Sequence, residues 1–207
     1  MPALLEGAWL TIRLTLGSVS AGLILGLILA LGRLSKNAFL DGLSKFYIWF
    51  FRGTPLLLQI FFIYYAVPTF TPISIDALPA AFIALSLNSG AYLAEIIRAA
   101  IQSIDKGQME ASKALGMSYI QAMGKIIIPQ SYRRLIPPIG NELIALLKDS
   151  SLVSVIAMTE LMRTTSLLAN SSGNAVYYLP CAVLYLAMTS LFTFVFSKLE
   201  KKYSVYE

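Results

Sequence analysis

The sequence predicts an all-α membrane protein with five transmembrane helices. Hydrophobic residues make up 57% of the 207-residue chain and charged residues only 13%, about half the charged share of an ordinary soluble domain. Several uncharged stretches are long enough to cross a bilayer, and Lys and Arg gather in alternate connections between them. These observations exclude a disordered chain, a charged coiled coil and most soluble enzymes.

Five helices follow from the apolar stretches. A hydrocarbon core of about 30 Å needs about 20 helical residues. The stretches 14–32, 53–75, 77–94 and 164–197 carry no formal charge, and a fifth, 139–158, is interrupted by Glu142, Lys148 and Asp149. We therefore expect helices at about 8–32, 43–66, 78–102, 133–162 and 178–199, which together form a single transmembrane domain over residues 1–207.

The rare residue types narrow the chemistry. The chain has no histidine and a single cysteine, Cys181, so a His-based triad, a His-ligated metal and an internal disulfide are excluded, and no Cys-cluster zinc site can form. We expect Cys181 to be a small packing residue. The sequence predicts no metal site, no catalytic residue and no nucleic-acid partner.

The basic residues set the direction of the helices. The connections at 67–77 and 164–177 contain no Lys or Arg. Basic residues lie instead in and beside the first and third connections and at the chain end, namely Arg33, Lys36, Lys45, Lys106, Lys113, Lys125, Arg133, Arg134, Lys198, Lys201 and Lys202. Five crossings then place the amino terminus outside and the carboxy terminus in the cytoplasm. The tyrosine pairs 64–65 and 177–178 suit either an outer aromatic belt or simple core packing.

The third connection, at about 103–130, predicts two short capped helices. Asp105 lies three residues before Gln108, which resembles a capping box, and Gly116 offers the left-handed residue that ends a helix. Ser118 and Gln121 repeat the capping signal. We expect Pro129 to stop the second helix, so that the loop forms a rigid cytoplasmic protrusion.

The same loop carries a known motif. Glu110-Ala111-Ser112, then Gly116, then Ile126, Ile128 and Pro129 resemble the EAA motif of importer-type ABC permeases, in which EAA is followed by three residues, Gly, nine residues, Ile, one residue and Leu-Pro. Only Ser112 and Ile128 depart from that pattern. The segments FRGTPLLLQ (51–59), AYLAEIIRAAI (91–101) and KDSSL (148–152) are similar to the polar amino-acid uptake branch of these permeases, so the resemblance covers nearly the whole chain.

The resemblance implies a type I ABC importer (MetI-like) permease fold in a prokaryotic inner membrane. It implies that the EAA loop couples the chain to a separate ATPase subunit, present in two copies, and that a solute-binding protein delivers the substrate from outside. The implied coupling residues are Glu110, Ala111, Ser112, Leu115 and Gly116.

The chain itself supports a separate ATPase. It has no G-x-x-x-x-G-K-[ST] run, the phosphate-binding motif of ATPases. Gly124-Lys125 matches only the G-K pair, because position 119 is Tyr instead of Gly and position 126 is Ile instead of Ser or Thr. We therefore expect no cofactor in this chain, with ATP and Mg on the partner ATPase, and no enzyme activity of its own. Five spans from one copy are too few to seal a path, so we expect a second permease chain and favour a homodimer over a pair of related chains.

Polar residues cluster at the middle of three predicted helices. A charge at mid-span costs about 2.5–3.5 kcal/mol on insertion scales, and is tolerated when it faces a bundle interior or a wet cavity. The segments 52–55, 88–90 and 148–149 fall at similar depth. We expect the helix to be broken near Gly90, so that a resuming helix points amide N–H groups at a carboxylate.

These residues predict a substrate site for a polar amino acid. Two carboxylates, seven residues apart and therefore about 10 Å along one helix, favour a basic amino acid such as arginine, lysine or histidine. The predicted site consists of Asn88, Ser89, Gly90, Tyr92, Glu142 and Asp149.

Structural roles compete for several charged residues. The pair Lys148-Asp149 lies in the KDSSL segment, which resembles a motif of the whole branch, so a structural role stands beside ligand contact. Glu95 and Arg98 suit a surface ion pair or a contact to the loop, and Glu160 with Arg163 suits an exposed i,i+3 pair better than an entry gate. Arg52 suits either a substrate carboxylate or neutralisation of Glu142 or Asp149.

Two other classes of function remain open. A channel or an ion-gradient-driven transporter explains the midplane polar groups but leaves the capped cytoplasmic loop without a role. Without histidine, an intramembrane enzyme would need a serine or carboxylate site, and Glu142 and Asp149 lie on one helix rather than facing each other across a cleft. The leading hypothesis is an ATP-driven permease for basic amino acids.

Overall fold

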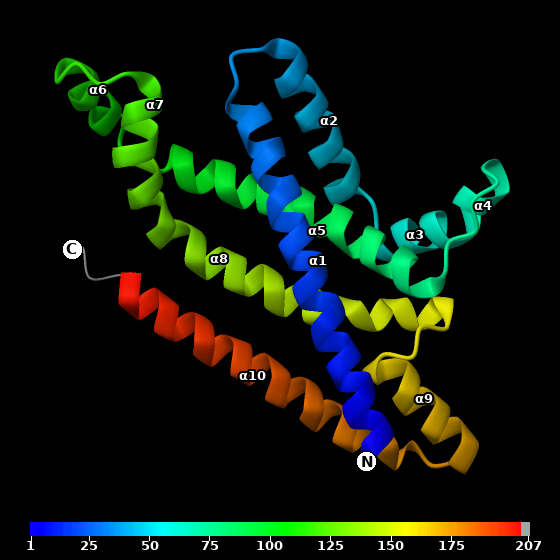
Figure 1. Ribbon diagram of the computed structural model, residues 1–207. Helices are drawn as coiled ribbons and strands as arrows, with labels where there is room; N and C mark the ends of the chain where they lie inside the picture. The colour runs from blue at the N-terminus through cyan, green and yellow to red at the C-terminus, as the bar shows by residue number, and fades with distance from the viewer. Residues whose placement is uncertain (204–207) are drawn as a thin grey trace.

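The computed structural model describes residues 1–203, and within them the chain forms helices and no strands. Figure 1 shows α1 crossing in front of α5 and α8, while α6 and α7 protrude together at one end of the molecule. The amino terminus lies at the opposite end, beside α9 and the start of α10. The α-helices are α1 Pro2–Leu34, α2 Ala38–Gly53, α3 Leu56–Phe61, α4 Val67–Phe70, α5 Ala77–Gln102, α6 Lys106–Ala114, α7 Tyr119–Ala122, α8 Ile128–Asp149, α9 Leu161–Ser172 and α10 Tyr178–Tyr203.

Shorter turns join some of these helices. The π-helical turns η1 (Phe62–Ala66) and η2 (Met123–Ile127) connect α3 to α4 and α7 to α8. The 3-10 turns η3 (Ser150–Ile156) and η4 (Ala175–Tyr177) follow α8 and precede α10.

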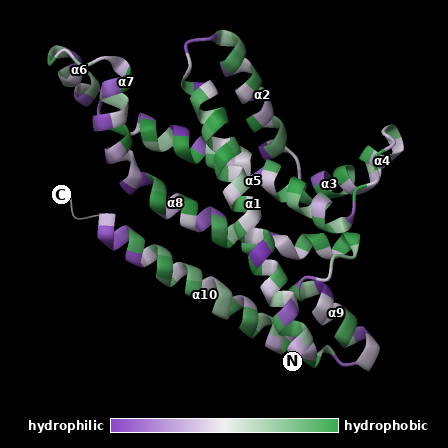
Figure 2. Ribbon diagram, in the orientation of Figure 1, coloured by the Kyte–Doolittle hydropathy of each residue, from purple (hydrophilic) through white to green (hydrophobic). Residues whose placement is uncertain are grey.

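Three predicted spans are confirmed as long apolar helices. In the described part of the chain, Pro2–Leu34, Ala77–Gln102 and Ala175–Tyr203 are long and apolar enough to cross a membrane, and Ala38–Gly53 with Leu56–Phe70 adds one bent pair. The expected count of five is therefore not confirmed. Figure 2 shows apolar residues along most of α10, in contrast to the mixed polar and apolar residues of α6 and α7.

The second predicted helix, 43–66, is not continuous. Its two parts meet at Thr54 and Pro55 with a bend of 104°. Thr54 is extended, with φ −114° and ψ 145°, as expected for a residue whose helical conformation clashes with a following proline ring. The break exposes backbone groups in the middle of the bundle.

The fourth predicted helix, 133–162, also needs correction. α8 begins at Ile128 and ends at Asp149, and the left-handed Ala157 (φ 60°) closes the 3-10 turn that follows. A separate helix, α9, starts at Leu161. Pro129 does not stop the preceding helix, because it occupies the first turn of α8, where a missing N–H is tolerated, directly after the wider π turn of η2.

Small residues bring α1 and α5 into close contact. A Cβ at Gly26 would lie 2.9 Å from the Leu93 Cβ and 3.0 Å from the Ala94 nitrogen, and one at Gly22 would lie 3.1 Å from the Gly90 nitrogen. Such backbone approach is typical of membrane helix pairs. A buried core that includes Leu14, Ile60, Leu85, Leu146 and Val153 joins this pair to α3, α8 and η3.

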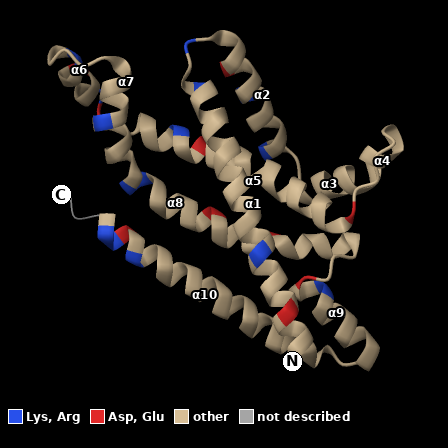
Figure 3. Cartoon of the chain, in the orientation of Figure 1, with Lys and Arg blue, Asp and Glu red and all other residues tan. Residues whose placement is uncertain are grey.

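Charged residues are distributed unevenly over the molecule. Lys and Arg gather around α6 and α7, at the turn between α1 and α2 and at the far end of α10 (Figure 3). The opposite end, which holds the amino terminus and α9, has few of them. The basic connections of the sequence thus meet at one end of the fold.

Candidate functional site: a midspan cavity and a capped loop

A cavity of about 440 Å³ lies where the α2–α3 break faces α5 and α8. We call it the midspan cavity. It is lined by Thr54, Pro55, Leu56, Asn88, Tyr92, Glu142, Ala145, Leu146, Asp149 and Leu152.

Four of the six predicted site residues line this cavity, and a fifth supports it from behind. Asn88 and Tyr92 come from α5, and Glu142 and Asp149 from α8. Ser89 is fully buried and its hydroxyl donates to Glu142 Oε1 at 2.9 Å. The structure therefore brings these residues to one place through the packing of α5 on α8.

Gly90 does not line the cavity. A Cβ at this position would lie 2.8 Å from Leu25 Cδ2 of α1, so the glycine permits helix contact on the other side of α5. The expected break at Gly90 is wrong, because α5 runs without interruption from Ala77 to Gln102. The broken backbone lies at Thr54 and Pro55 instead, and α3 begins there without a side-chain cap.

Gln59 holds the break together, a role that the sequence did not reveal. Its Nε2 donates to the Phe51 carbonyl at 2.9 Å, to the Thr54 carbonyl at 3.1 Å and to the Thr54 hydroxyl at 2.8 Å. Its Oε1 accepts from Asn88 Nδ2 at 3.0 Å. Buried carbonyls released by a proline need such partners, and the only available signal was an amide within an apolar run.

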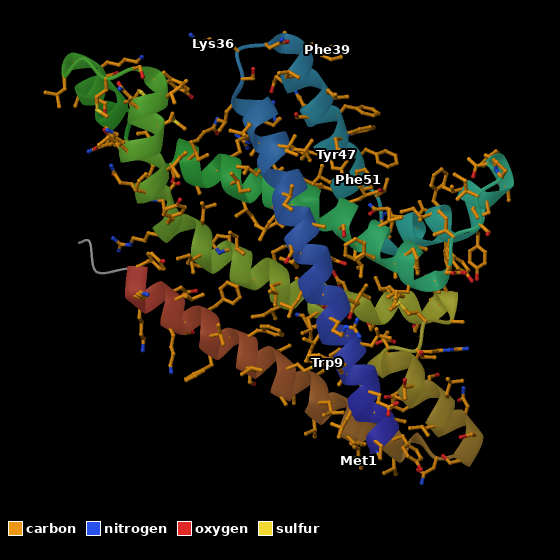
Figure 4. All side chains as sticks on the ribbon, viewed as in Figure 1. Met1, Trp9, Lys36, Phe39, Tyr47 and Phe51 are labelled. Atoms are coloured by element: carbon orange, nitrogen blue, oxygen red, sulfur yellow. The ribbon has the colours of Figure 1, made fainter. Side chains whose placement is uncertain are left out.

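The end of α2 is also tied to α5 above the break. Tyr47 and Phe51, labelled in Figure 4, come from α2 and stack with ring centroids 4.4 Å apart. The Tyr47 hydroxyl donates to the Leu87 carbonyl at 2.8 Å, and Asn88 Nδ2 donates to the Phe51 carbonyl at 3.3 Å. The wall of the cavity formed by the break is therefore fixed from two sides.

The two cavity carboxylates lie outside the ion pairs of the described residues. Those pairs join Arg33 to Asp41, Arg52 to Glu95 and Arg98 to Glu95. Glu142 accepts the Ser89 hydrogen bond, and Lys148 is exposed beside Asp149. The midspan cavity is therefore acidic, since no Lys or Arg is among the residues that line it.

A second cavity, of about 450 Å³, opens towards the α5–α6 connection. We call it the vestibule. It is lined by Arg52, Tyr92, Glu95, Ile96, Ala99, Ala100, Ser103, Arg134 and Pro138.

Two charged pairs lie at the vestibule. The Glu95–Arg98 pair is confirmed, with Arg98 Nη2 2.6 Å from Glu95 Oε2. Arg52 makes its ion pair with Glu95, with its Nη1 3.9 Å from Glu95 Oε2 and its Cζ 5.2 Å from the centroid of the Tyr92 ring, and it also interacts electrostatically with Glu142.

Glu160 corrects another expectation. It is fully buried and caps α9 by accepting from the backbone N–H groups of Met162 at 2.8 Å and Arg163 at 2.7 Å. The Tyr185 hydroxyl donates to it at 3.2 Å. The predicted exposed pair with Arg163 is therefore wrong, and Glu160 joins α9 to α10. Cys181 is buried in the apolar cluster nearby, as expected.

The third connection folds into the two predicted short helices. Asp105 caps α6 through the Gly107 N–H, and Gly116, at φ 79°, ends it with a bond from its N–H to the Lys113 carbonyl. Ser118 and Gln121 form the predicted capping box of α7. Gln108 does not return to Asp105; its side chain bonds to Gln130 instead.

Four of the five predicted coupling residues are exposed. Glu110, Ala111, Leu115 and Gly116 face outwards, and the Leu115 side chain is 83% exposed. Ser112 is buried and donates to the Gln108 carbonyl at 2.6 Å. Ser112 thus serves the internal packing of the loop, whereas the others form part of its outer surface.

Comparisons with known proteins agree with this architecture. Residues 22–205 match the family described as binding-protein-dependent transport system inner membrane component. The chain is 40% identical to the arginine transport system permease protein ArtQ of Bacillus subtilis (strain 168) over 98% of its length and 93% of the relative. It is 41% identical to the L-cystine transport system permease protein TcyB of the same organism, over 99% and 88%.

A third relative and a solved structure extend the comparison. The putative glutamine transport system permease protein GlnP of Rickettsia typhi is 38% identical over 96% of this chain and 92% of its own. A chain from the crystal structure of an amino acid ABC transporter with histidines superimposes with a TM-score of 0.92 at 38% identity, over 97% of this chain and 94% of that one.

Proposed function

Because the chain belongs to the family of binding-protein-dependent transport system inner membrane components, as a permease subunit of an amino-acid ABC importer, we propose that its midspan cavity binds a basic amino acid during transport. The proposed substrate residues are those predicted from the sequence: Asn88, Ser89, Gly90, Tyr92, Glu142 and Asp149. Within this set, Gly90 and Ser89 act indirectly, by setting the position of α5 against α1 and of Glu142 in the cavity.

The acidic lining carries this proposal. Glu142 and Asp149 line the cavity, and no basic residue lines it with them. A guanidinium, ammonium or imidazolium group would offset the cost of keeping such carboxylates away from bulk water. The relatives differ in the substrates that their names state, namely arginine, glutamine and L-cystine, so the preference is argued from the cavity alone.

The capped loop supports coupling to a separate ATPase. α6 and α7 protrude from the bundle, and the outer surface formed by Glu110, Ala111, Leu115 and Gly116 is free of internal packing. We assign this surface to a groove on one ATPase subunit; the assembly would hold two such subunits, which bind ATP and Mg²⁺. A second permease chain, in our view an identical one, and a solute-binding protein on the outer side complete the assembly.

The basic end of the fold supports an orientation with α6 and α7 in the cytoplasm. By the positive-inside rule, the excess of Lys and Arg at that end (Figure 3) supports an amino terminus on the outer side. The vestibule then opens towards the cytoplasm.

Direct binding to the permease–ATPase complex tests the substrate proposal, because it removes the selectivity of any solute-binding protein. In the purified complex, Glu142→Gln with Asp149→Asn should weaken arginine binding about tenfold or more, or at least about 1.4 kcal/mol, and leave glutamine binding nearly unchanged. A matched double variant, Glu6→Gln with Glu200→Gln, removes two exposed carboxylates outside the cavity and should change neither. An unaltered preference for arginine in the cavity variant would reject the proposal.

The same complex in proteoliposomes separates the competing class of transporter. The importer is supported if arginine accumulates in the compartment that faces the ATPase subunits and if this accumulation requires ATP in the same compartment. Accumulation driven by an ion gradient without nucleotide would support a secondary transporter instead.

A further inference from the structure

Tyr92 separates the two cavities on the route through the chain. It is the residue of α5 that lines both the midspan cavity and the vestibule, and it is 38% exposed. Tyr92 is the contact that the two cavities share on α5. The groups that surround its ring are therefore placed to act on a solute that moves from one cavity to the other.

The sign of charge reverses across this ring. The midspan cavity is lined by Glu142 and Asp149 with no basic residue. The vestibule is lined by Arg52 and Arg134 with one acid, Glu95, and Glu95 is already engaged by Arg98 at 2.6 Å. A cation in the midspan cavity thus faces excess positive charge on its way out.

Arg52 is the vestibule cation that can change position. Arg134 is held by a hydrogen bond from its Nη1 to the Ser103 carbonyl at 2.9 Å, and Arg98 holds Glu95. Arg52 makes only looser contacts, with its Cζ 5.2 Å from the Tyr92 centroid and its Nη1 3.9 Å from Glu95, and 43% of its side chain is exposed. Its backbone, in contrast, lies just before the break that Gln59 fixes.

We propose that Arg52 is an electrostatic gate for cationic substrates. With its guanidinium over Tyr92, it blocks the aromatic face on which a departing cation would rest and repels that cation. A rotation towards Glu95 uncovers the ring and opens the path. The gate rests on the proposed basic substrate, because a neutral amino acid does not experience this charge barrier.

Passive efflux from proteoliposomes tests the gate. The complete transporter is reconstituted, loaded with radiolabelled arginine or glutamine, and followed without nucleotide. Arg52→Gln should raise arginine efflux about tenfold or more, because it removes one positive charge beside the path of a departing cation, and change glutamine efflux less than about twofold. Arg52→Lys should keep arginine efflux near the wild-type rate.

Two further variants keep the test decisive. Glu95→Gln makes the vestibule more positive and should slow ATP-driven arginine uptake relative to glutamine, which tests the gate even where Arg52→Gln does not assemble. Lys45→Gln removes an exposed charge from the same helix, outside both cavities, and should change nothing. Equal efflux increases for both solutes, or unchanged arginine efflux in Arg52→Gln together with unchanged uptake in Glu95→Gln, would overturn the gate. Wild-type protein that neither binds nor accumulates arginine would overturn the proposed function itself.

Discussion

The α1–α5 pair and the α2–α3 break are built in opposite ways: the first packs two continuous helices closely, and the second interrupts a helix. α1 and α5 are continuous helices whose backbones approach through Gly22, Gly26 and Gly90. α2 and α3 meet at an extended Thr54 followed by Pro55, and they keep their freed carbonyls satisfied through a buried amide, that of Gln59. The first region contributes rigidity, and the second contributes a polar wall to the cavity.

The difference shows how an apolar chain can surround a polar chamber. In a bilayer, each unsatisfied backbone group costs several kcal/mol, so a broken helix is tolerated only beside side-chain partners or a wet cavity. Here the partners come from a single glutamine and from Asn88 of the rigid helix α5. The break is therefore held against the rigid pair, and each region can be perturbed separately.

The largest loss of stability is expected from a substitution in the α1–α5 pair. Gly26→Val adds atoms where a Cβ alone would be 2.9 Å from Leu93 and 3.0 Å from the Ala94 backbone nitrogen. Such overpacking costs about 3 kcal/mol, so the thermal unfolding midpoint of the purified complex should fall by several degrees. Gly42→Val, at a glycine with open space around it, should leave the midpoint nearly unchanged, and an equal loss at both positions would contradict the packing argument.

An intermediate effect is expected at the break. Gln59→Leu keeps the side-chain volume similar but removes the donor to the Thr54 carbonyl and the partner of Asn88. A buried polar group left unpaired costs about 1–3 kcal/mol, so both the unfolding midpoint and arginine binding should decrease. The exposed Gln130, whose side-chain amide donates to the Gln108 side chain, provides the control. Gln130→Leu should lower the unfolding midpoint less than Gln59→Leu does, and the reverse order would refute the role of Gln59.

The smallest effect is expected at Thr54. Thr54→Val keeps the shape but removes a hydroxyl that donates to the Phe50 carbonyl at 2.9 Å and accepts from Gln59 at 2.8 Å. Since Gln59 retains its two carbonyl partners, the loss should be about 1 kcal/mol, visible as a small shift in chemical or thermal unfolding. Thr69→Val, at an exposed threonine outside the cavity, should shift it less. A Thr54 effect as large as that of Gln59→Leu would mean that the hydroxyl, not the amide, holds the break.

The sequence predicted the parts that depend on local pattern. Apolar length located α1, α5 and α10, and the capping residues Asp105, Ser118 and Gly116 located the two helices of the loop. Asn88, Glu142 and Asp149 were found because charged or amide groups are rare within apolar stretches, and Tyr92 was found by its four-residue spacing from Asn88. Each of these signals lies within a few residues of the feature that it predicts.

The remaining features depend on contacts between distant segments. A glycine inside a span suits either a break or close packing, and only Leu25 of α1 decides between them for Gly90. The role of Gln59 depends on carbonyls that Pro55 releases. Glu160 caps α9 although Glu is not among the favoured N-cap residues, so its position on the chain gave no signal for that helix start.

The uninterrupted path through α7, η2 and α8 has a mechanical consequence. From Tyr119 to Asp149 the chain stays helical, although it bends between α7 and α8 (Figure 1) and α8 holds Pro137 and Pro138 in its interior. Interior prolines and π turns are places where a helix kinks. Because Glu142 and Asp149 lie on α8, a movement of α6 and α7 reaches these two carboxylates through continuous helical backbone.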